Sequence, residues 1–438
     1  MNLAYKYPII FWDCANLIVD SGTIEGINDK TSDYNKIARA VNKIKSAGIS
    51  ISLIDINKSE LSFTPNVEAN SIHYGLGGLQ GVGNEVALEI IKNRPYSSID
   101  DFINKVKVNK TVMVSLIKAG AFDKFMPREK AMHYYIELVS DTKQRLTLQN
   151  FAALASNNCL PNELKFQRQV FNFNAGLKKA CKFNADYFAL DNNDRYYRFY
   201  NKYFDDNFIE PVDNHICVSK KNWKKQYDKV MIKAKEYIQE NKENLLKRLN
   251  SSIVRENFDK YANGNISHWE MESLGTYSHE HELKNIDYAL YGISSFKELP
   301  QSPIVEYTFK RNGTEFPIFK TYKIVGTVIA KDEMHSQITI LTPENNTVNV
   351  KMSKEYFSQY NKRISEIMPN GTKKVREQSF FQRGTLVMLN GFIRNETFVL
   401  KAYKRKGKKQ HQLYKITQVN PNGTIEMTNA RYGESIDN

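Results

Sequence analysis

Cysteine is scarce in this sequence, and the few cysteines lie far apart. Cys14, Cys159, Cys181 and Cys217 form no C-x-x-C pair. Their spacing argues against structural zinc and against a disulfide framework, and it fits a reducing cytoplasm. No apolar run approaches the roughly 20 residues that a membrane span needs. Residues 1–19 lack the basic start and cleavage site of a signal peptide. We therefore expect a cytoplasmic protein without a membrane partner.

Acidic residues are in deficit. The 438 residues carry 48 Asp and Glu against 62 Lys and Arg, a formal net charge of +14. A polyanionic partner is expected, with nucleic acid ahead of a membrane surface. The hydrophobic fraction of 41% and the charged fraction of 25% are those of a globular chain. The length predicts two to four domains.

Paired catalytic acids are missing as well. Two-metal phosphoryl transfer needs acids that hold two ions about 4 Å apart, and the acids here are scattered. Asp100-Asp101 is expected to begin and cap a helix. For His279 and His281, beside Glu280 and Glu282, a structural role is favoured over a metal cluster. The sequence predicts no catalytic residue, no metal site and no cofactor on this chain. The acids considered are Asp100, Asp101, Asp191, Asp194, Asp205 and Asp206.

A glycine-rich turn is the most informative feature that is present. Gly75-Leu-Gly-Gly-Leu-Gln-Gly-Val-Gly83 precedes a helical pattern over Asn84 to Arg94. Such a turn leaves main-chain N–H groups free at a helix N-terminus, where the dipole favours a phosphate. Val82 would anchor the turn in the core. Because the turn contacts the backbone and not the bases, it suggests nucleic-acid binding without sequence preference.

A second, similar unit follows. Lys110 to Lys118 is predicted to be a helix, and Ala119-Gly-Ala-Phe-Asp123 a degenerate hairpin, after the intervening Ser98-Ile-Asp-Asp-Phe102. A lone Gly-x-Gly also occurs at ordinary helix starts, whereas two such units in succession are more specific. Paired hairpins straddle a duplex and grip both of its strands.

Residues 72–125 resemble the tandem helix-hairpin-helix of bacterial replicative DNA polymerase III alpha subunits. Three flanking segments are similar to that family: Ala4-Tyr-Lys-Tyr-Pro8 with Phe11, Ala47-Gly-Ile49, and Asp55-Ile-Asn-Lys-Ser59. Glu272-Ser-Leu-Gly-Thr-Tyr-Ser278 with His281 resembles the segment before the family's OB domain. Glu280 and Glu282 replace the Gly and Pro that are usual there.

The resemblance implies which residues contact DNA. Gly81, Val82, Gly83 and Asn84 would hold the phosphates of one strand. Lys118, Gly120 and Ala121 would serve the other strand, with Ala121 in place of a flexible glycine. Nearby lysines would add long-range attraction, so affinity should fall steeply with salt. These lysines are Lys105, Lys107, Lys110 and Lys124.

After Pro303 the sequence predicts an OB-type barrel. Five strands, with a helix at 354–368 after the third, are expected at 322–330, 337–341, 347–352, 385–393 and 397–402. If Ile338, Ile340, Val348 and Val350 face the core, then a polar set faces outward. No aromatic platform for base stacking occurs in that set, so a purely structural or protein-contacting barrel is as much expected as one that binds single strands. The set is Gln337, Thr339, Thr347, Asn349 and Lys351.

The middle of the chain carries no motif. Residues 126–260 are expected to be mostly helical, with one long helix that begins after Ser219 and carries an apolar stripe from Trp223 to Leu249. A solvated face is favoured for its lysines over a DNA contact. The family also implies a sliding-clamp partner. Gln378-Ser-Phe-Phe381 has the look of a clamp tether, but it lies inside the barrel, where packing is the favoured use.

The predicted fold is multidomain α+β, with a helical N-terminal half, a helical middle and a C-terminal five-stranded barrel. We expect boundaries at 1–70 (end of fingers), 71–125 (hairpins), 126–300 (helical region), 301–410 (OB domain) and 411–438 (tail). The resemblance implies a polymerase component that grips DNA while a separate chain carries the palm and its Mg²⁺. Alternatives are a stand-alone DNA-binding accessory protein and a nuclease with acids in 126–260.

Overall fold

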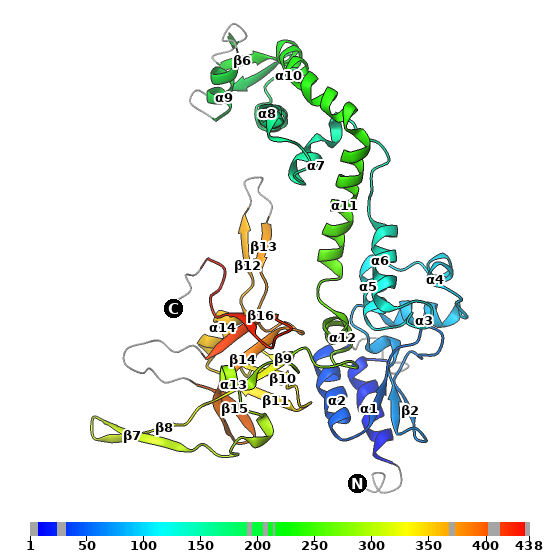
Figure 1. Cartoon of the computed structure of the whole chain (residues 1–438), viewed down its shortest axis with the longest axis vertical. Helices are drawn as coiled ribbons and strands as arrows, with labels where there is room; N and C mark the ends of the chain where they lie inside the picture. Colours follow the sequence, from blue (N-terminus) through cyan, green and yellow to red (C-terminus); the bar gives the residue numbers. More distant parts are fainter. Residues whose placement is uncertain are drawn as a thin grey trace. The chain divides into compact units, whose positions relative to one another are not determined.

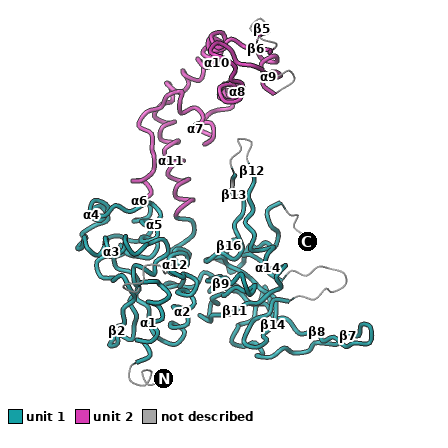
Figure 2. The backbone as a smooth tube through the Cα atoms, turned by 180° about the vertical axis from the view of Figure 1, so that it is seen from behind, with its two compact units in different colours: residues 1–134, 262–438 teal, residues 135–261 magenta. Residues whose placement is uncertain are grey.

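The computed structural model describes residues 8–23, 32–190, 195–204, 209–212, 215–367, 373–401 and 412–433. The chain forms two compact units: residues 1–134 with 262–438, and residues 135–261 (Figure 2). Several predicted features lie outside the described residues. They are residues 4–7 of the N-terminal resemblance and the acids Asp191, Asp194, Asp205 and Asp206.

The first unit begins with two helices (Figure 1). α1 spans Ile9–Ser21 and ends at Gly22, whose φ of 68° suits a glycine. α2 spans Tyr34–Ser46, and the Asp33 side chain caps it by accepting from two backbone N–H groups. A short strand follows these helices. β1 (Ser50–Ser52) pairs in parallel with β3 (Ser71–His73), which pairs with β2 (Thr64–Asn66).

Short helices and tight turns make up the hairpin region. They are the 3-10 turn η1 (Leu76–Gly78), α3 (Asn84–Lys92), α4 (Ile99–Lys105), α5 (Lys110–Lys118) and α6 (Arg128–Val139). Ser98 and Asn109 cap α4 and α5 through their side chains. The rings of Tyr96 and Phe122 both lie about 5 Å from that of buried Phe102, and this packing joins the two hairpin units. α12 (Ile266–Leu274) packs on α5.

The second unit is mainly helical but also contains a small sheet that the sequence analysis missed. Its helices are the 3-10 turns η2 (Leu148–Asn150) and η3 (Asn162–Leu164), and α7 (Phe151–Ser156), α8 (Lys165–Ala180), α9 (Arg195–Tyr203), α10 (Lys220–Glu240) and α11 (Lys242–Tyr261). Its strands are β4 (Tyr187–Leu190), β5 (Ile209–Val212) and β6 (His215–Ser219), in the order β4-β6-β5. These strands are four or five residues long, too short to show a clear alternation.

The prediction of a single long helix after Ser219 is wrong in one respect. The structure has two helices there, α10 and α11, separated at Asn241. The predicted apolar stripe is nevertheless buried. Trp223, Ala234 and Ile238 of α10 and Leu245 and Leu249 of α11 lie in the cores of the second unit. The break changes the helix direction without changing which side faces inward.

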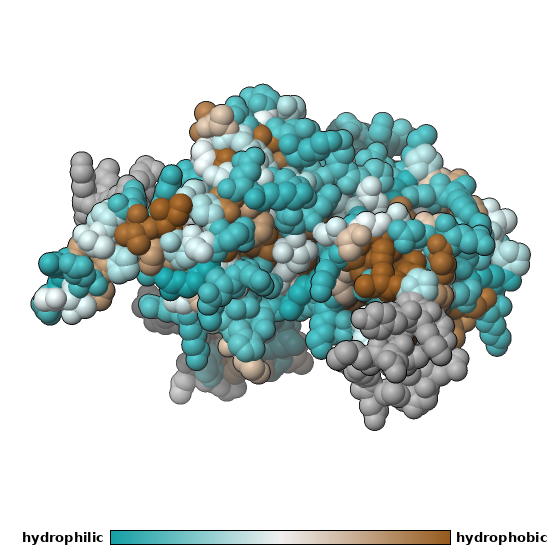
Figure 3. All heavy atoms as spheres, turned by 90° about the horizontal axis from the view of Figure 1, so that it is seen from below, coloured by the Kyte–Doolittle hydropathy of each residue, from teal (hydrophilic) through white to brown (hydrophobic). Residues whose placement is uncertain are grey.

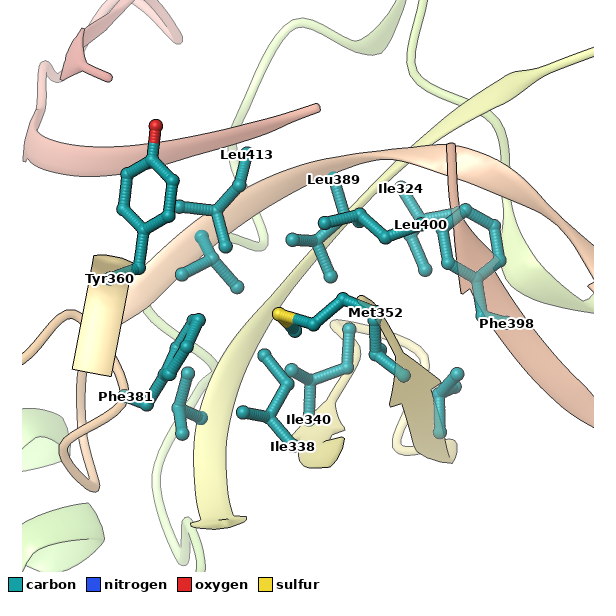
Figure 4. Packing of buried hydrophobic residues seen from close by; sticks show 14 of the residues in the cluster. Ile324, Ile338, Ile340, Met352, Tyr360, Phe381, Leu389, Phe398, Leu400 and Leu413 are labelled. Atoms are coloured by element: carbon teal, nitrogen blue, oxygen red, sulfur yellow. The ribbon is translucent and has the colours of Figure 1, made fainter. Parts of the chain in front are cut away.

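The barrel closes with OB-type topology. Its strands are β9 (Tyr322–Asp332), β10 (Gln337–Leu341), β11 (Thr347–Lys351), β14 (Leu386–Arg394) and β15 (Thr397–Leu400). β9 pairs with β10 and β14, and β15 closes the ring by pairing antiparallel with β14 and parallel with β11. Side chains from all five strands fill its core (Figure 4). The predicted α+β fold class and barrel are confirmed.

The helix predicted over 354–368 is too long. α14 spans Lys354–Asn361, capped by Ser353, and β12 (Ile364–Ile367) follows and pairs with β13 (Lys373–Glu377). The β-branched residues Ile364 and Ile367 favour a strand there. Part of the tail also forms strands. β16 (Leu413–Val419) pairs with β14, and β17 (Ile425–Thr428) pairs with β16.

A β-hairpin that was not predicted precedes the barrel. It follows the short helix α13 (Tyr288–Tyr291) and the 3-10 turn η5 (Phe296–Glu298). β7 (Val305–Arg311) and β8 (Thr314–Phe319) are joined by Asn312-Gly313, a common hairpin turn that the sequence displays. Tyr307, Phe309 and Phe316 are each more than 40% exposed. Figure 3 shows apolar atoms along the hairpin at its left.

Candidate nucleic-acid interface

The first hairpin turn has a buried anchor and an exposed tip. Leu79 and Val82 are 0% and 1% exposed, whereas Gly81, Gly83 and Asn84 are exposed. The Val82 N–H donates to the Leu79 carbonyl at 3.1 Å, and Gly81 has a φ of +88° that disfavours other residues. The burial of Val82 and the exposure of the other three residues agree with the expected turn, and DNA binding by all four stays a prediction.

The N-terminus of α3 opens to solvent at this tip. Gly83 is the N-cap residue and offers no side chain to the first turn. Within the described residues, no protein group accepts from the N–H groups of Asn84, Glu85 or Val86; the first bonded amide is Ala87, which donates to Gly83. A Cβ added to Gly83 would meet nothing within 4 Å. Three amides at the positive end of the helix dipole thus have no acceptor among the described residues, an arrangement that suits a phosphate.

The preceding glycines have a different role. A Cβ on Gly75 would lie 2.4 Å from the Ser62 backbone, and one on Gly77 would lie 2.4 Å from the Thr23 methyl group. A Cβ on Gly78 would lie 2.7 Å from the Phe63 ring. These glycines permit close packing beneath the turn, while Gly81 and Gly83 keep its tip open.

The turn is fixed from three directions within its unit. The Gln80 carbonyl accepts from the Ser115 hydroxyl of α5 at 2.5 Å, and the Gln80 N–H donates to the Ser273 carbonyl of α12. The Gln80 side-chain oxygen accepts from Arg383 at 3.0 Å, so a residue beside the barrel also supports the hairpin. Sequence reasoning missed these contacts because their partners lie up to 303 residues away. They hold the amides of α3 in place before any ligand arrives.

The turn of the second hairpin is buried, and its amides donate to other groups of the protein. Gly120 has a φ of +83°, as a turn requires, but Gly120 and Ala121 are buried. The Gly120 N–H donates to Ile117 and the Ala121 N–H to Leu116, each at 3.0 Å. Both amides are therefore used within the protein. DNA binding by Gly120 and Ala121 stays a prediction, and their burial does not favour it.

A buried ion cluster lies in front of this second turn. Arg128, whose side chain is 2% exposed, pairs with Asp123 at 2.5 Å and with fully buried Glu270 at 3.0 Å. Burial alone would raise the pKa of Glu270, but hydrogen bonds from the His279 and Ser278 N–H groups hold that pKa below its usual value. A Cβ on Gly120 would lie 2.4 Å from the Arg128 guanidinium. This turn therefore contributes to packing and electrostatics within the unit.

The predicted lysines differ in their availability. Lys118 is largely buried and forms an ion pair with Glu272, and Lys124 pairs with Asp55 at 2.5 Å. The hydrogen bond to Asp55 raises the pKa of Lys124. Lys110 is exposed at the first position of α5. Of these lysines, Lys118 is the least able to reach a ligand.

Comparison with known proteins bears on this geometry. Residues 48–132 match the family described as "Helix-hairpin-helix motif". The chain is 36% identical over 447 residues to "Probable DNA polymerase YorL" of Bacillus subtilis (strain 168) and to "DNA-directed DNA polymerase" of Bacillus phage SPbeta. The chain is related to DNA polymerases. "DNA polymerase III subunit alpha" of Aquifex aeolicus (strain VF5) is 34% identical over 148 residues, 32% of this chain and 12% of that protein.

The predicted resemblance to polymerase III alpha subunits is thereby confirmed. The match to the two Bacillus relatives covers 98% of this chain but only 34% of each relative. This polymerase-related chain thus spans about a third of their length, and it carries a helix-hairpin-helix motif. The motif match at 48–132 also takes in the small sheet β1-β3-β2 ahead of the hairpins.

The predicted polar face of the barrel is only partly open. Gln337 and Lys351 are cross-strand partners, half-buried and exposed respectively. The expectation that Thr339 faces solvent is wrong, because Thr339 is 3% exposed. On the same face of β10, Leu341 packs against Ala38 of α2, so α2 covers this side of the barrel. DNA binding by Gln337 and Lys351 stays a prediction.

Two further candidate sites have structural roles. Phe380 and Phe381 are 0% and 1% exposed in the barrel core, so the clamp-like segment is packed as favoured. His281 accepts from the Leu283 N–H at 3.1 Å, and its other ring nitrogen lies 3.1 Å from the Leu341 carbonyl. Burial lowers the pKa of His281 to about 4.

Within the described ranges, no three His, Cys, Asp or Glu residues gather as metal ligands would. Among the helices of those ranges, none has the length and apolar character that crossing a membrane requires.

Proposed function

We propose that this chain grips duplex DNA for a DNA polymerase of the polymerase III alpha type. The amides of residues 84–86 at the start of α3 bind a phosphate of one strand. The observation that carries this proposal is the N-terminus of α3: among the described residues none accepts from the amides of residues 84–86, and the N-cap Gly83 has no side chain. Gly81 and Gly83 let the DNA backbone approach, and Val82 fixes the turn from below.

In this proposal the chemistry belongs to residues outside this chain. A palm on a partner polypeptide carries the paired carboxylates and two Mg²⁺ ions that nucleotidyl transfer needs. The support is that this chain spans 34% of the DNA polymerases it matches. The work takes place in the cytoplasm, and a sliding clamp is a further proposed partner. Exposed lysines such as Lys110 attract the duplex over a distance.

Copurification tests whether a partner polypeptide carries the catalytic palm while this chain binds DNA. The tagged chain, recovered after nuclease treatment, is expected to bring with it a polypeptide that bears paired palm carboxylates. Primer extension by that complex should be lost when this chain is depleted and restored when it is added back. Extension that proceeds equally well without this chain would contradict the proposal.

The second candidate is a stand-alone DNA-binding accessory protein of replication or repair. It rests on the same α3 amides, which need no polymerase in order to hold a phosphate. This candidate predicts tight duplex binding by the isolated chain and no stable complex with a palm-bearing protein. The purification described above therefore separates the two candidates.

A further inference from the structure

Residues 220–235 of α10 carry an excess of positive charge. Between residues 220 and 235 the only acidic residue is Asp228. The lysines of this stretch are Lys220, Lys221, Lys224, Lys225, Lys229, Lys233 and Lys235. The stretch lies in the second unit, outside the residues that match the helix-hairpin-helix family.

Four of these lysines form a stripe, which we call the α10 stripe. Lys221, Lys225, Lys229 and Lys233 are spaced four residues apart, and all four are exposed. At about 100° per residue, the stripe is centred on the side of the helix opposite its buried seam. With a rise of about 1.5 Å per residue, the stripe is about 18 Å long. The seam consists of Trp223, Met231, Ala234 and Ile238.

Carboxylates do not neutralise the α10 stripe. Asp228 lies 3.9 Å from Lys235, which is not part of the stripe. Within the described part of the second unit, no ion pair or hydrogen bond involves the ammonium groups of the four stripe lysines. Glu236, one turn beyond Lys233, is the acid that comes next on this face. The stripe is therefore a rigid row of free positive charge.

We propose that the α10 stripe binds the phosphate backbone of duplex DNA as a second contact, independent of the hairpin at α3. A DNA strand presents one phosphate per about 3.4 Å along its axis, so a row about 18 Å long reaches several phosphates. The stripe carries no aromatic side chain on which a base could stack, which favours a duplex backbone over a single strand.

An anionic membrane is a poorer partner for the same lysines. Helices that lie on membranes bury an apolar face among the lipids. The apolar face of α10 is already buried in the second unit, where Trp223 donates to Asn174 of α8 at 3.0 Å. Ile232, 50% exposed, is the large apolar residue left beside the stripe.

Salt dependence provides the test. The full chain and a variant with the four stripe lysines changed to Gln are titrated with a duplex oligonucleotide at several salt concentrations. Four lost phosphate contacts lower the slope of log affinity against log salt by about 3.6. Between about 50 and 200 mM salt, the wild-type affinity should fall about 150-fold more than the variant affinity. Gln keeps a high helix propensity, so α10 should remain folded.

A matched control removes the same net charge elsewhere. It changes to Gln four lysines that already have carboxylate partners: Lys36, Lys143, Lys284 and Lys310. Its slope should stay close to the wild-type value. If the stripe variant and the wild type have equal salt slopes, the proposal is overturned. If the control variant loses as much slope as the stripe variant, the effect comes from net charge alone, and the proposal is overturned as well.

Two further readouts separate this proposal from others. Bound duplex should protect Lys225 and Lys229 from acetylation more than it protects Lys235. A stripe variant that loses binding to anionic lipid vesicles while its DNA slope is unchanged would assign the stripe to membranes and overturn the proposal. If changing the α3 hairpin leaves DNA binding unchanged while the stripe effect persists, the proposed function alone is contradicted.

Discussion

Replacing Gly83 by Asp should separate the stability of this protein from its DNA binding. Gly83 is the N-cap of α3, with φ −78° and ψ 160°, a conformation that any residue adopts. A Cβ there meets nothing within 4 Å. An Asp side chain at an N-cap accepts from the second or third amide of the helix, here Glu85 or Val86. The new carboxylate would thus occupy the site proposed for the phosphate.

The two effects differ greatly in size. Gly is only a few tenths of a kcal/mol worse than Asp at an N-cap, so the free energy of unfolding should change by less than about 0.5 kcal/mol. A charge-assisted hydrogen bond contributes about 1.5–3 kcal/mol, so each amide withdrawn from the phosphate costs about 10- to 150-fold in affinity. Repulsion between two anions about 4 Å apart adds about 1 kcal/mol even in water. We expect a loss of about 50-fold or more.

The assay is duplex binding at fixed salt, together with thermal unfolding of the same samples. Asn265→Asp is the control, because Asn265 is the N-cap of α12 and its side chain already accepts from the His268 N–H at 2.8 Å. It adds the same charge at the same helix position without blocking an open site. If Gly83→Asp keeps its stability and binds DNA within threefold of wild type, the amides of α3 are not the phosphate site.

Three further outcomes are expected. Glu85→Gln should raise duplex affinity about two- to fivefold in the same titration, because an exposed carboxylate in the first turn of α3 repels a phosphate nearby. Gly77→Ala should lower the free energy of unfolding by about 1–3 kcal/mol in denaturant, since its Cβ would overlap the anchored Thr23 methyl group. The pKa of His281 is lowered to about 4 from the 6.5 of an unfolded chain, so the unfolded state binds more protons between these values. Stability should therefore fall by about 3 kcal/mol from pH 6.5 to 4, and the decline should be shallower in His281→Asn.

Periodic and local features could be predicted from the sequence. The bounds of α5 and β10 agree with expectation, although each of these elements is buried on more than one side. The hairpin at Asn312-Gly313 was missed although its turn signal is local. Strands as short as β4 and β5 show no clear alternation of polar and apolar residues. The break at Asn241 could not be predicted because the apolar stripe is buried both before and after it.

By itself the sequence determined the kind of contact to expect, which is between main-chain amides and a nucleic-acid phosphate. A glycine-rich turn before a helix, an apolar residue to anchor that turn, and a basic chain all indicate it. The sequence did not determine which glycines stay open. Gly77 and Gly83 look alike in the sequence, yet one lies against Thr23 and the other faces open space. Likewise nothing in the sequence near Lys118 shows that folding pairs it with Glu272, 154 residues away. Exposure and charge pairing depend on segments distant along the chain, so only the tertiary structure could decide them.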